Sequence, residues 1–243
     1  MSDIAPQPVR GADRVDSLLR ELRAQGVEGV QRAPRLHERR RPDPGLADLL
    51  ERGFPRGLLS EVAGPLSSGR TSFVLALIAR ATRIGEWAAW VEISDAFDPT
   101  SAAAAGVSLE RTLWARAPSV QKALRATERL LEAGGFASVV LDLSPALGRR
   151  ANPIHVPGGA WSRLRKRAAE GESALIALGE RRSASSFSDL AFELGEARPR
   201  FDGVPAFFSG LEGVVAVVRN RAGPGPQHAT WKTCRGRVEI SAA

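Results

Sequence analysis

The chain of 243 residues contains no tyrosine, one cysteine, one methionine and three scattered histidines. The single Cys234 excludes an internal disulfide, and the histidines form no recurring ligand spacing, so we expect no structural zinc. The longest strongly apolar stretch, Phe73–Ile78, is far shorter than the about 20 residues that span a bilayer, and no basic segment followed by an apolar run opens the chain. We therefore expect a cytoplasmic protein with one main core and no membrane partner.

Lysine is scarce as well, since Lys122, Lys166 and Lys232 are the only three, and arginine carries most of the formal net charge of +7. The excess lies in the second half, where residues 149–200 hold ten basic and six acidic side chains. Such a half can meet a polyanion such as nucleic acid, or it can be an ordinary solvated face. Charge alone leaves both interpretations open.

The first 44 residues differ from the rest in pattern. Val15, Leu18, Leu19 and Leu22 keep helical spacing. Residues 32–44 combine Arg39-Arg40-Arg41 with three prolines, which is typical of an extended basic linker. We predict an N-terminal helical arm and linker over residues 1–44 and one core domain over residues 45–243.

Within the core, apolar runs alternate with helical segments, a pattern typical of an α/β fold with a mostly parallel central sheet flanked by helices. Strands are expected at Leu58–Ala63, Ala88–Ile93, Thr112–Ala115, Ser138–Leu143, Ala174–Gly179 and Gly213–Arg219, and helices at Thr71–Ile84, Ser119–Ala133 and Trp161–Glu170. Alternating polar and apolar residues predict antiparallel edge strands at Phe192–Phe201 and Trp231–Ile240.

The most informative motif lies between the first predicted strand and the first predicted helix of the core. Residues 64–71 read Gly-Pro-Leu-Ser-Ser-Gly-Arg-Thr, which is the G-x-x-x-x-G-basic-Ser/Thr spacing of a phosphate-binding loop. Glycines at both ends let backbone N–H groups turn toward phosphate oxygens, and the helix adds its N-terminal dipole. The candidate nucleotide-binding residues here are Gly64, Ser67, Ser68, Gly69, Arg70 and Thr71, with the Thr71 hydroxyl as a Mg²⁺ ligand.

One residue departs from the usual loop, because Arg70 stands where such loops normally have lysine. Guanidinium keeps the charge but is planar, bulkier and differently aimed, so the exchange is not conservative. A second acidic element follows at Asp142, which ends the apolar run Ser138–Asp142 and is our candidate for the carboxylate that holds Mg²⁺. An aspartate at a strand end can equally cap the following loop.

In order and spacing, these segments resemble the ATPase core of bacterial RecA recombinases from about Gly45 to the C-terminus. The resemblance rests on Gly53–Leu58, Glu61–Thr71, Asp98-Pro99 and the strand ending at Asp142. It implies a RecA-like P-loop NTPase core that binds ATP and Mg²⁺, with Asp98 at the nucleotide and no room for RecA's separate C-terminal domain. The arm before Arg32 is similar to the segment by which RecA protomers dock on one another.

Several positions differ from the RecA pattern. Ser94 stands where RecA has the glutamate that orients the attacking water, and a serine cannot act as that base. Ser101 replaces the aromatic residue that stacks on adenine, and Glu180 replaces the glutamine that senses the γ-phosphate. Glu92 and Asp95 flank Ser94, so a shifted carboxylate is conceivable. We expect a degenerate P-loop ATPase with weak or absent turnover.

The resemblance also points to nucleic-acid and subunit contacts. The two DNA-binding loops of RecA correspond to residues 148–159, with Arg149 and Arg150, and to residues 181–189, with Arg181, Arg182 and Phe187. Arginines could track a phosphate backbone while Phe187 stacks on a base. Equally, the second loop could be solvated with Phe187 tucked into the core. Arg219 and Arg221 match the basic strand end that reaches the neighbouring subunit's ATP in RecA filaments.

A truncated RecA-like chain with Arg70 in its P-loop and no glutamate at Ser94 is most similar to the ImuA family, the RecA-related accessory factors of the bacterial SOS mutagenesis cassette. The resemblance implies a nucleoid-associated DNA-repair factor in translesion synthesis. Its implied partners are RecA, the Y-family polymerase homologue ImuB, an error-prone polymerase and single-stranded DNA. Two alternatives stay open: an active DNA-stimulated ATPase or recombinase, and a RecA-superfamily regulator unrelated to repair.

Overall fold

The computed structural model describes residues 53–145, 154–221, 227–234 and 237–242. The predicted N-terminal arm and linker, and with them the docking segment, lie outside these residues, as do Arg149 and Arg150. Within the described part, no helix is long and apolar enough to cross a membrane.

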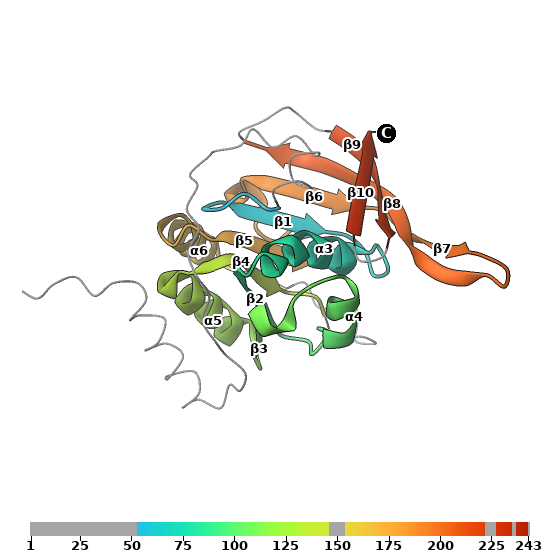
Figure 1. Cartoon of the computed structure of the whole chain (residues 1–243). Coiled ribbons are helices and arrows are strands. Elements are labelled where there is room, and N and C mark those ends of the chain that lie inside the picture. The colour runs from blue at the N-terminus through green and yellow to red at the C-terminus, as the bar shows by residue number, and fades with distance from the viewer. Residues whose placement is uncertain (1–52, 146–153, 222–226, 235–236, 243) are drawn as a thin grey trace, which may run out of the picture.

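A ten-stranded sheet forms the centre of the molecule (Figure 1). Six strands make a parallel block in the order β6-β1-β5-β4-β2-β3, and β8, β9 and β10 extend it antiparallel beyond β6. The parallel strands are β1 (Leu59–Ala63), β2 (Trp87–Glu92), β3 (Thr112–Arg116), β4 (Phe136–Asp142), β5 (Ala174–Gly179) and β6 (Leu190–Leu194). The others are β7 (Arg198–Asp202), β8 (Phe207–Asn220), β9 (Gln227–Cys234) and β10 (Arg237–Ala242), with β7 paired to β8.

Helices cover both faces of the parallel block, so the hydrophobic core consists of two clusters, one on each face of the sheet. On one face, α3 (Arg70–Arg83) and α4 (Pro99–Ala104) enclose a cluster that includes Phe73, Trp90, Phe192 and Trp231. On the other face, α5 (Val120–Ala133) and α6 (Gly158–Glu170) cover a second cluster around Trp161 and Leu131. Short 3-10 turns lie at Leu109–Arg111 and Ser185–Phe187.

Local sequence accounts for these helices. The Ser119 side chain caps α5 by accepting from the Lys122 N–H, and Gly134 ends the helix with a positive φ of 67°. The buried residues of α5 recur at helical spacing, namely Ala123, Thr127, Leu130 and Leu131. The short α4, which the sequence pattern did not predict, is capped by the Asp98 carboxylate.

The predicted α/β class and mostly parallel sheet are confirmed, but the segment Phe192–Phe201 is not one antiparallel edge strand. It divides at Gly195 into β6, which runs parallel to β1 inside the sheet, and β7, which pairs only with β8. The physical reason is burial, because β6 is covered on both faces except at Glu193, whereas β7 is largely exposed. The segment Trp231–Ile240, predicted as one antiparallel edge strand, is likewise divided between β9 and β10, which pair antiparallel with each other, with β10 at the sheet edge.

Candidate functional site

The predicted phosphate loop joins β1 to α3 at the carboxyl edge of the parallel strands, as its sequence context requires. Ser67 and Gly69 both have left-handed backbone conformations, with φ of 65° and 75°. These conformations turn the chain before the first residue of α3, and Phe73 N–H already bonds to the Gly69 carbonyl. The backbone therefore has the turn that a phosphate cradle needs.

Arg70 does not extend from the loop into solvent, since only 6% of its surface is exposed. One terminal nitrogen, Nη1, donates to the carbonyl oxygens of Gly64 at 2.7 Å and Pro65 at 2.6 Å. The other, Nη2, donates to the Ser144 hydroxyl at 3.2 Å. The residue predicted to bind phosphate thus uses both terminal nitrogens on the protein itself.

Asp142, the predicted Mg²⁺ ligand, lies beside this arginine at the end of β4 and is almost fully buried. Its Oδ1 accepts from the Ser144 N–H at 2.8 Å, so the aspartate caps the next turn. Burial raises the pKa of Asp142, and Glu92 adds to the rise, while Ser144 and Arg70 oppose it. Burial likewise lowers the pKa of Arg70, against the attraction of Asp142 and Glu180.

The two carboxylates that flank Ser94 in sequence are both engaged with other groups of the chain, so neither takes the place of the glutamate that is missing at Ser94. Glu92 is fully buried, and its Oε2 accepts from the N–H groups of Ala96 at 2.6 Å and Phe97 at 3.0 Å. Its Oε1 accepts from Trp114 Nε1 at 2.7 Å. Asp95 instead pairs at the surface with Arg116 at 2.9 Å. Glu92 therefore fixes the segment after β2.

Asp98, predicted to lie at the nucleotide, uses its carboxylate to begin α4. It accepts from the N–H groups of Thr100 and Ser101 and from the Ser101 hydroxyl, at 3.2, 2.9 and 2.5 Å. The hydrogen bond from the Ser101 side chain is the main reason that the pKa of Asp98 lies below its usual value. Ser101, which stands at the position of the adenine-stacking residue, is thus part of a helix cap.

The antiparallel part of the sheet packs directly against the phosphate loop. A Cβ on Gly69 would come within 2.3 Å of the fully buried Trp231 ring in β9, so only glycine fits there. Ala197 N–H, from the connection between β6 and β7, donates to the Ser67 carbonyl at 3.3 Å. The loop is therefore held by residues more than 120 positions away in sequence.

These contacts decide how well the loop suits a nucleotide. The backbone turn fits a phosphate group, and Thr71 is only half-buried at its end. A phosphate would have to compete with two carbonyls and Ser144 for the guanidinium of Arg70, whose Nε has no hydrogen-bond partner among the described residues. The residues fit phosphate binding, whereas the carboxylates of Glu92 and Asp95 are engaged elsewhere.

The side chain of Glu61 in β1 anchors residues 181–189, the loop predicted to bind DNA. This buried carboxylate accepts from Ser183 N–H and, at 2.7 Å, from Ala184 N–H, and it lies 3.4 Å from Arg182 Nε. Phe187 packs against the second core cluster and meets Gly158 at the start of α6. Arg181 is exposed to solvent.

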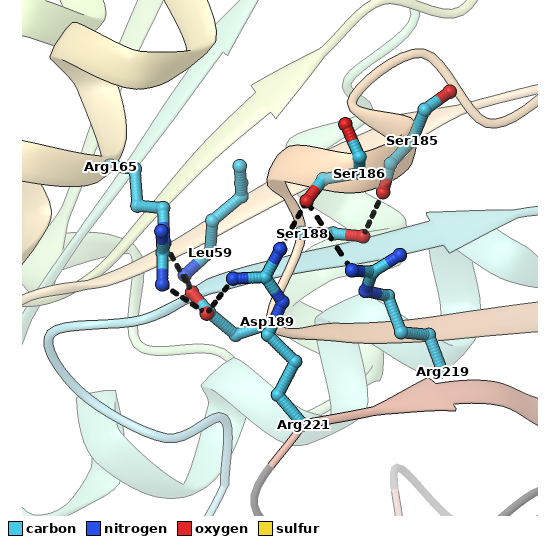
Figure 2. Close-up of polar contacts among 8 residues, drawn as sticks. All are labelled: Leu59, Arg165, Ser185, Ser186, Ser188, Asp189, Arg219 and Arg221. Carbon is cyan, nitrogen blue, oxygen red and sulfur yellow. Dashed lines mark hydrogen bonds and ion pairs between the residues drawn. The ribbon is translucent and has the colours of Figure 1, made fainter.

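Asp189 organises the far end of the same loop (Figure 2). Its carboxylate pairs in bidentate fashion with Arg165 at 3.0 and 2.6 Å and accepts from Leu59 N–H at 3.2 Å. Arg221 lies 3.8 Å from it and also donates to the Ser186 carbonyl, which Arg219 reaches at 3.4 Å. The two arginines predicted to contact a neighbouring subunit are thus joined to the loop predicted to contact DNA.

The basic face of α6 is largely neutralised by acidic residues. Arg163 pairs with Glu128 at 3.5 Å, and Arg167 pairs with Glu132 at 2.8 Å, so α5 and α6 present complementary charges. A hydrogen bond to Glu170 raises the pKa of Arg167. This part of the basic second half is a solvated, paired face.

The structure brings the predicted loop residues, Asp142 and Asp98 to one edge of the sheet, and places Arg182, Phe187, Arg219 and Arg221 around residues 181–189. Sequence reasoning missed Glu61, Asp189 and Trp231 as organisers. A charge inside the apolar run Leu59–Ala63 was a usable signal for Glu61, because a lone carboxylate in a buried strand needs partners. Nothing local marked Trp231 as the neighbour of Gly69.

Comparisons with known proteins agree with this geometry. Residues 47–155 match the family model of the RecA N-terminal domain. RecA of Rubrobacter xylanophilus is 41% identical over 99 residues, which cover 41% of this chain and 29% of that protein. RecA of Chlorobaculum parvum is 42% identical over 95 residues, covering 39% and 27%. The matched segment therefore spans less than a third of these relatives.

Solved structures extend the likeness over most of the chain. The RadB recombinase superposes with a TM-score of 0.61 at 19% identity, covering 81% of this chain and 96% of that one. The flagellar accessory protein FlaH from Methanocaldococcus jannaschii superposes with a TM-score of 0.53 at 13% identity and the same coverage. The chain therefore has a RecA-like fold, and residues 47–155 are the part that matches the model of the RecA N-terminal domain.

Proposed function

We propose that this chain is a RecA-like DNA-repair accessory protein of the ImuA type, which acts in the SOS response and translesion synthesis by binding other components. Its proposed partners are RecA, the polymerase homologue ImuB, an error-prone polymerase and single-stranded DNA. Its proposed location is the cytoplasm, at the nucleoid. Hydrolysis of ATP is weak or absent in this proposal.

The observation that carries the proposal is that charged side chains at and near the phosphate loop are hydrogen-bonded to groups of the chain itself. Arg70 is bound to Gly64, Pro65 and Ser144, and Glu92 is bound to three donors of its own chain. Phosphoryl transfer needs a group that positions the attacking water, and Ser94 cannot supply a carboxylate. A RecA-like fold in this condition is suited to binding rather than to turnover.

The phosphates of a bound ATP would lie against residues 64–71, and Thr71 and Asp142 would hold Mg²⁺. The chain's own residues would cradle the phosphates by backbone N–H groups and would hold the ion at the end of β4. Binding in this way would require the guanidinium of Arg70 to leave the loop carbonyls. We therefore expect weak nucleotide affinity.

For nucleic acid, the proposal relies on residues 181–189 and the strand end at Arg219 and Arg221. Arg181 is exposed there, whereas Arg182 and Arg221 are paired with Glu61 and Asp189. Exposed arginines contact backbone phosphates without sequence reading, so Arg181 is the residue placed for this contact, while Arg182 and Arg221 would have to exchange a carboxylate for a phosphate. We expect binding of single-stranded DNA that weakens steeply with salt.

The test measures ATP turnover and the binding of a fluorescent ATP analogue by the full chain, with and without single-stranded DNA. The variants are Arg70→Lys and, as the control for a contaminating ATPase, Thr71→Ala. We expect wild-type turnover no greater than that of Thr71→Ala. We also expect Arg70→Lys to bind the analogue roughly tenfold more tightly, because an ammonium makes fewer bonds to the loop than a guanidinium does.

DNA-stimulated turnover that disappears in Thr71→Ala would overturn the proposal and establish the alternative, an active DNA-stimulated ATPase. Unchanged analogue binding in Arg70→Lys would show instead that Arg70 does not limit access to the loop. Tight analogue binding by the wild type would contradict the assignment of Arg70 as the occupant of the loop.

A further inference from the structure

The hairpin formed by β7 and the first part of β8 projects from the sheet, away from both helical layers (Figure 1). Its end carries four large apolar side chains in solvent. The exposed fractions are 58% for Phe201, 103% for Val204, 68% for Phe207 and 62% for Phe208. Phe201 and Phe208 touch each other edge to face, with ring centroids 6.1 Å apart. We call these four residues the hairpin tip.

The hairpin tip lies outside both core clusters, so the packing of the core does not explain its aromatic residues. Three phenylalanines within eight residues are also unusual for a projecting turn in water, because turns favour small and polar side chains. Phe201 and Phe208 lie on one face of the hairpin and Phe207, the neighbour of Phe208 in the strand, on the other. Large apolar side chains gathered in solvent at one end of a hairpin mark an interaction site. The remaining question is which class of partner covers it.

Charge argues against nucleic acid at the tip. Residues 201–208 contain one charged side chain, Asp202, and that charge is negative. The nearby Arg200 lies 3.9 Å from Asp202 and 3.8 Å from Glu212, so its guanidinium faces two carboxylates. A surface that binds a phosphate backbone needs unpaired positive charge, and the tip therefore suits an apolar partner.

The free edge of β7 argues against strand addition. Pro199 is the second residue of β7 and has no N–H to donate, and prolines on edge strands oppose pairing with a further strand. Close to this proline, a register shift between Arg200 and Phe201 interrupts the ladder between β7 and β8. A partner would therefore contact the side chains of the tip rather than its backbone.

Size argues against a symmetric contact between the tips of two copies of this chain. Aromatic side chains present roughly 150–250 Å² each, so the exposed part of the tip is on the order of 500 Å². Stable interfaces bury about 800 Å² per partner, which two tips in mutual contact do not reach. A groove that encloses the tip would add the flanks of both strands to the buried area.

We propose that the hairpin tip inserts into an apolar groove on a folded protein partner, with Phe201, Phe207 and Phe208 as the anchoring side chains. This inference rests on the proposed function, because it names the surface by which one of the proposed protein partners is bound. Aromatic anchors in a desolvated pocket carry a large share of binding energy. The association should therefore depend little on ionic strength.

The test uses the full chain with three immobilised probes: purified RecA filaments, the ImuB homologue and the error-prone polymerase. Dissociation constants are measured by interferometry at about 0.15 M and about 0.5 M NaCl, because the higher concentration screens interactions between exposed charges more strongly. The variant is the triple substitution Phe201→Ser, Phe207→Ser and Phe208→Ser. The matched control changes two exposed apolar residues elsewhere, Ile84→Ser with Leu109→Ser.

We expect the triple variant to lose at least about tenfold in affinity for one protein probe, with the control unchanged and little salt dependence. Equal binding of all probes by the triple variant would overturn the inference and leave the proposed function standing. Failure of the wild type to bind any probe would overturn both. Wild-type dimers in sedimentation that the triple variant abolishes would identify a second copy as the occupant and overturn the inference.

Discussion

The phosphate loop and the hairpin tip differ in where they place polar and apolar groups. At the loop, Arg70, Glu92 and Asp142 are buried and bonded within the chain. At the tip, Phe201, Phe207 and Phe208 are exposed. A catalytic site needs charged groups that point at its substrate. The surface of a protein that binds no partner has little need of large exposed aromatic side chains. In the proposed function, this RecA-like fold therefore acts by binding at its surface rather than by turnover at its loop.

The largest expected effect comes from Trp231→Ala, which removes the ring that covers Gly69. The Trp231 ring is fully buried against Phe73, and its Nε1 has no hydrogen-bond partner among the described residues, so the loss is one of packing. We expect the free energy of unfolding to fall by about 3–5 kcal/mol. Urea denaturation followed by tryptophan fluorescence measures this.

The control for that prediction is Phe208→Ala at the hairpin tip, which we expect to change the free energy of unfolding by less than about 0.5 kcal/mol. A similar cost for both substitutions would show that the tip is part of the folding core. The contrast between the two regions would then fail.

A smaller effect is expected for Glu92→Ala, because it removes the buried acceptor of three donors, of which the Phe97 N–H belongs to a buried residue and the other two are partly accessible. The donors are the N–H groups of Ala96 and Phe97 and the Trp114 indole. We expect a loss of roughly 3 kcal/mol in the free energy of unfolding. Thermal and urea unfolding of the two proteins provide the measurement.

The matched control is Asp95→Ala, which removes an exposed pair with Arg116 and should cost no more than about 0.5 kcal/mol. Should Glu92→Ala be as stable as the wild type yet alter nucleotide turnover, Glu92 would be a catalytic group and the proposed function would need revision.

The smallest expected effect is a pH dependence at Asp142. Its pKa is raised in the folded state, mainly by burial, so the folded protein binds this proton more tightly than the unfolded chain does. Its contribution to stability is therefore fully present below the ordinary pKa of about 4 and is lost as the pH rises through the raised value. Unfolding of wild type and Asp142→Asn is compared from pH 4 to pH 8.

We expect the free energy of unfolding of the wild type, relative to Asp142→Asn, to increase as the pH falls. A flat difference across this range would mean that Asp142 is charged at all these pH values, held so by Arg70. That outcome would favour a carboxylate ready to bind a metal ion.

Much of the fold could be predicted because the relevant signals are local. The alternation of apolar runs and helical segments predicted five of the six strands of the parallel block, and the strand Ala174–Gly179 was predicted to the residue. The expected strand Gly213–Arg219 lies in β8, which is antiparallel to β6. The division of Phe192–Phe201 was not predicted, because its first part belongs to β6, where Phe192 and Leu194 are buried beside β1, a strand far away in sequence. Burial on both faces, rather than local alternation, decided the direction of β6.

The candidate site divides in the same way. Spacing alone identified the loop from Gly64 to Thr71, since such a turn needs glycine and a hydroxyl residue at fixed positions. The roles of Arg70 and Glu92 depend on Ser144 and Trp114, which belong to other elements. A side chain's partners follow from which strands lie side by side, so residue type could suggest a role but not decide it.

By itself, the sequence determined the element pattern, the phosphate-loop turn, the lack of a carboxylate at Ser94 and the apolar character of residues 201–208. Only the tertiary structure decided that Arg70 binds its own loop, that Asp189 joins Arg165 to Arg221, and that Trp231 closes on Gly69. The physical reason is range. Backbone turns and periodic burial depend on neighbouring residues, whereas these contacts join segments that only the folded sheet brings together.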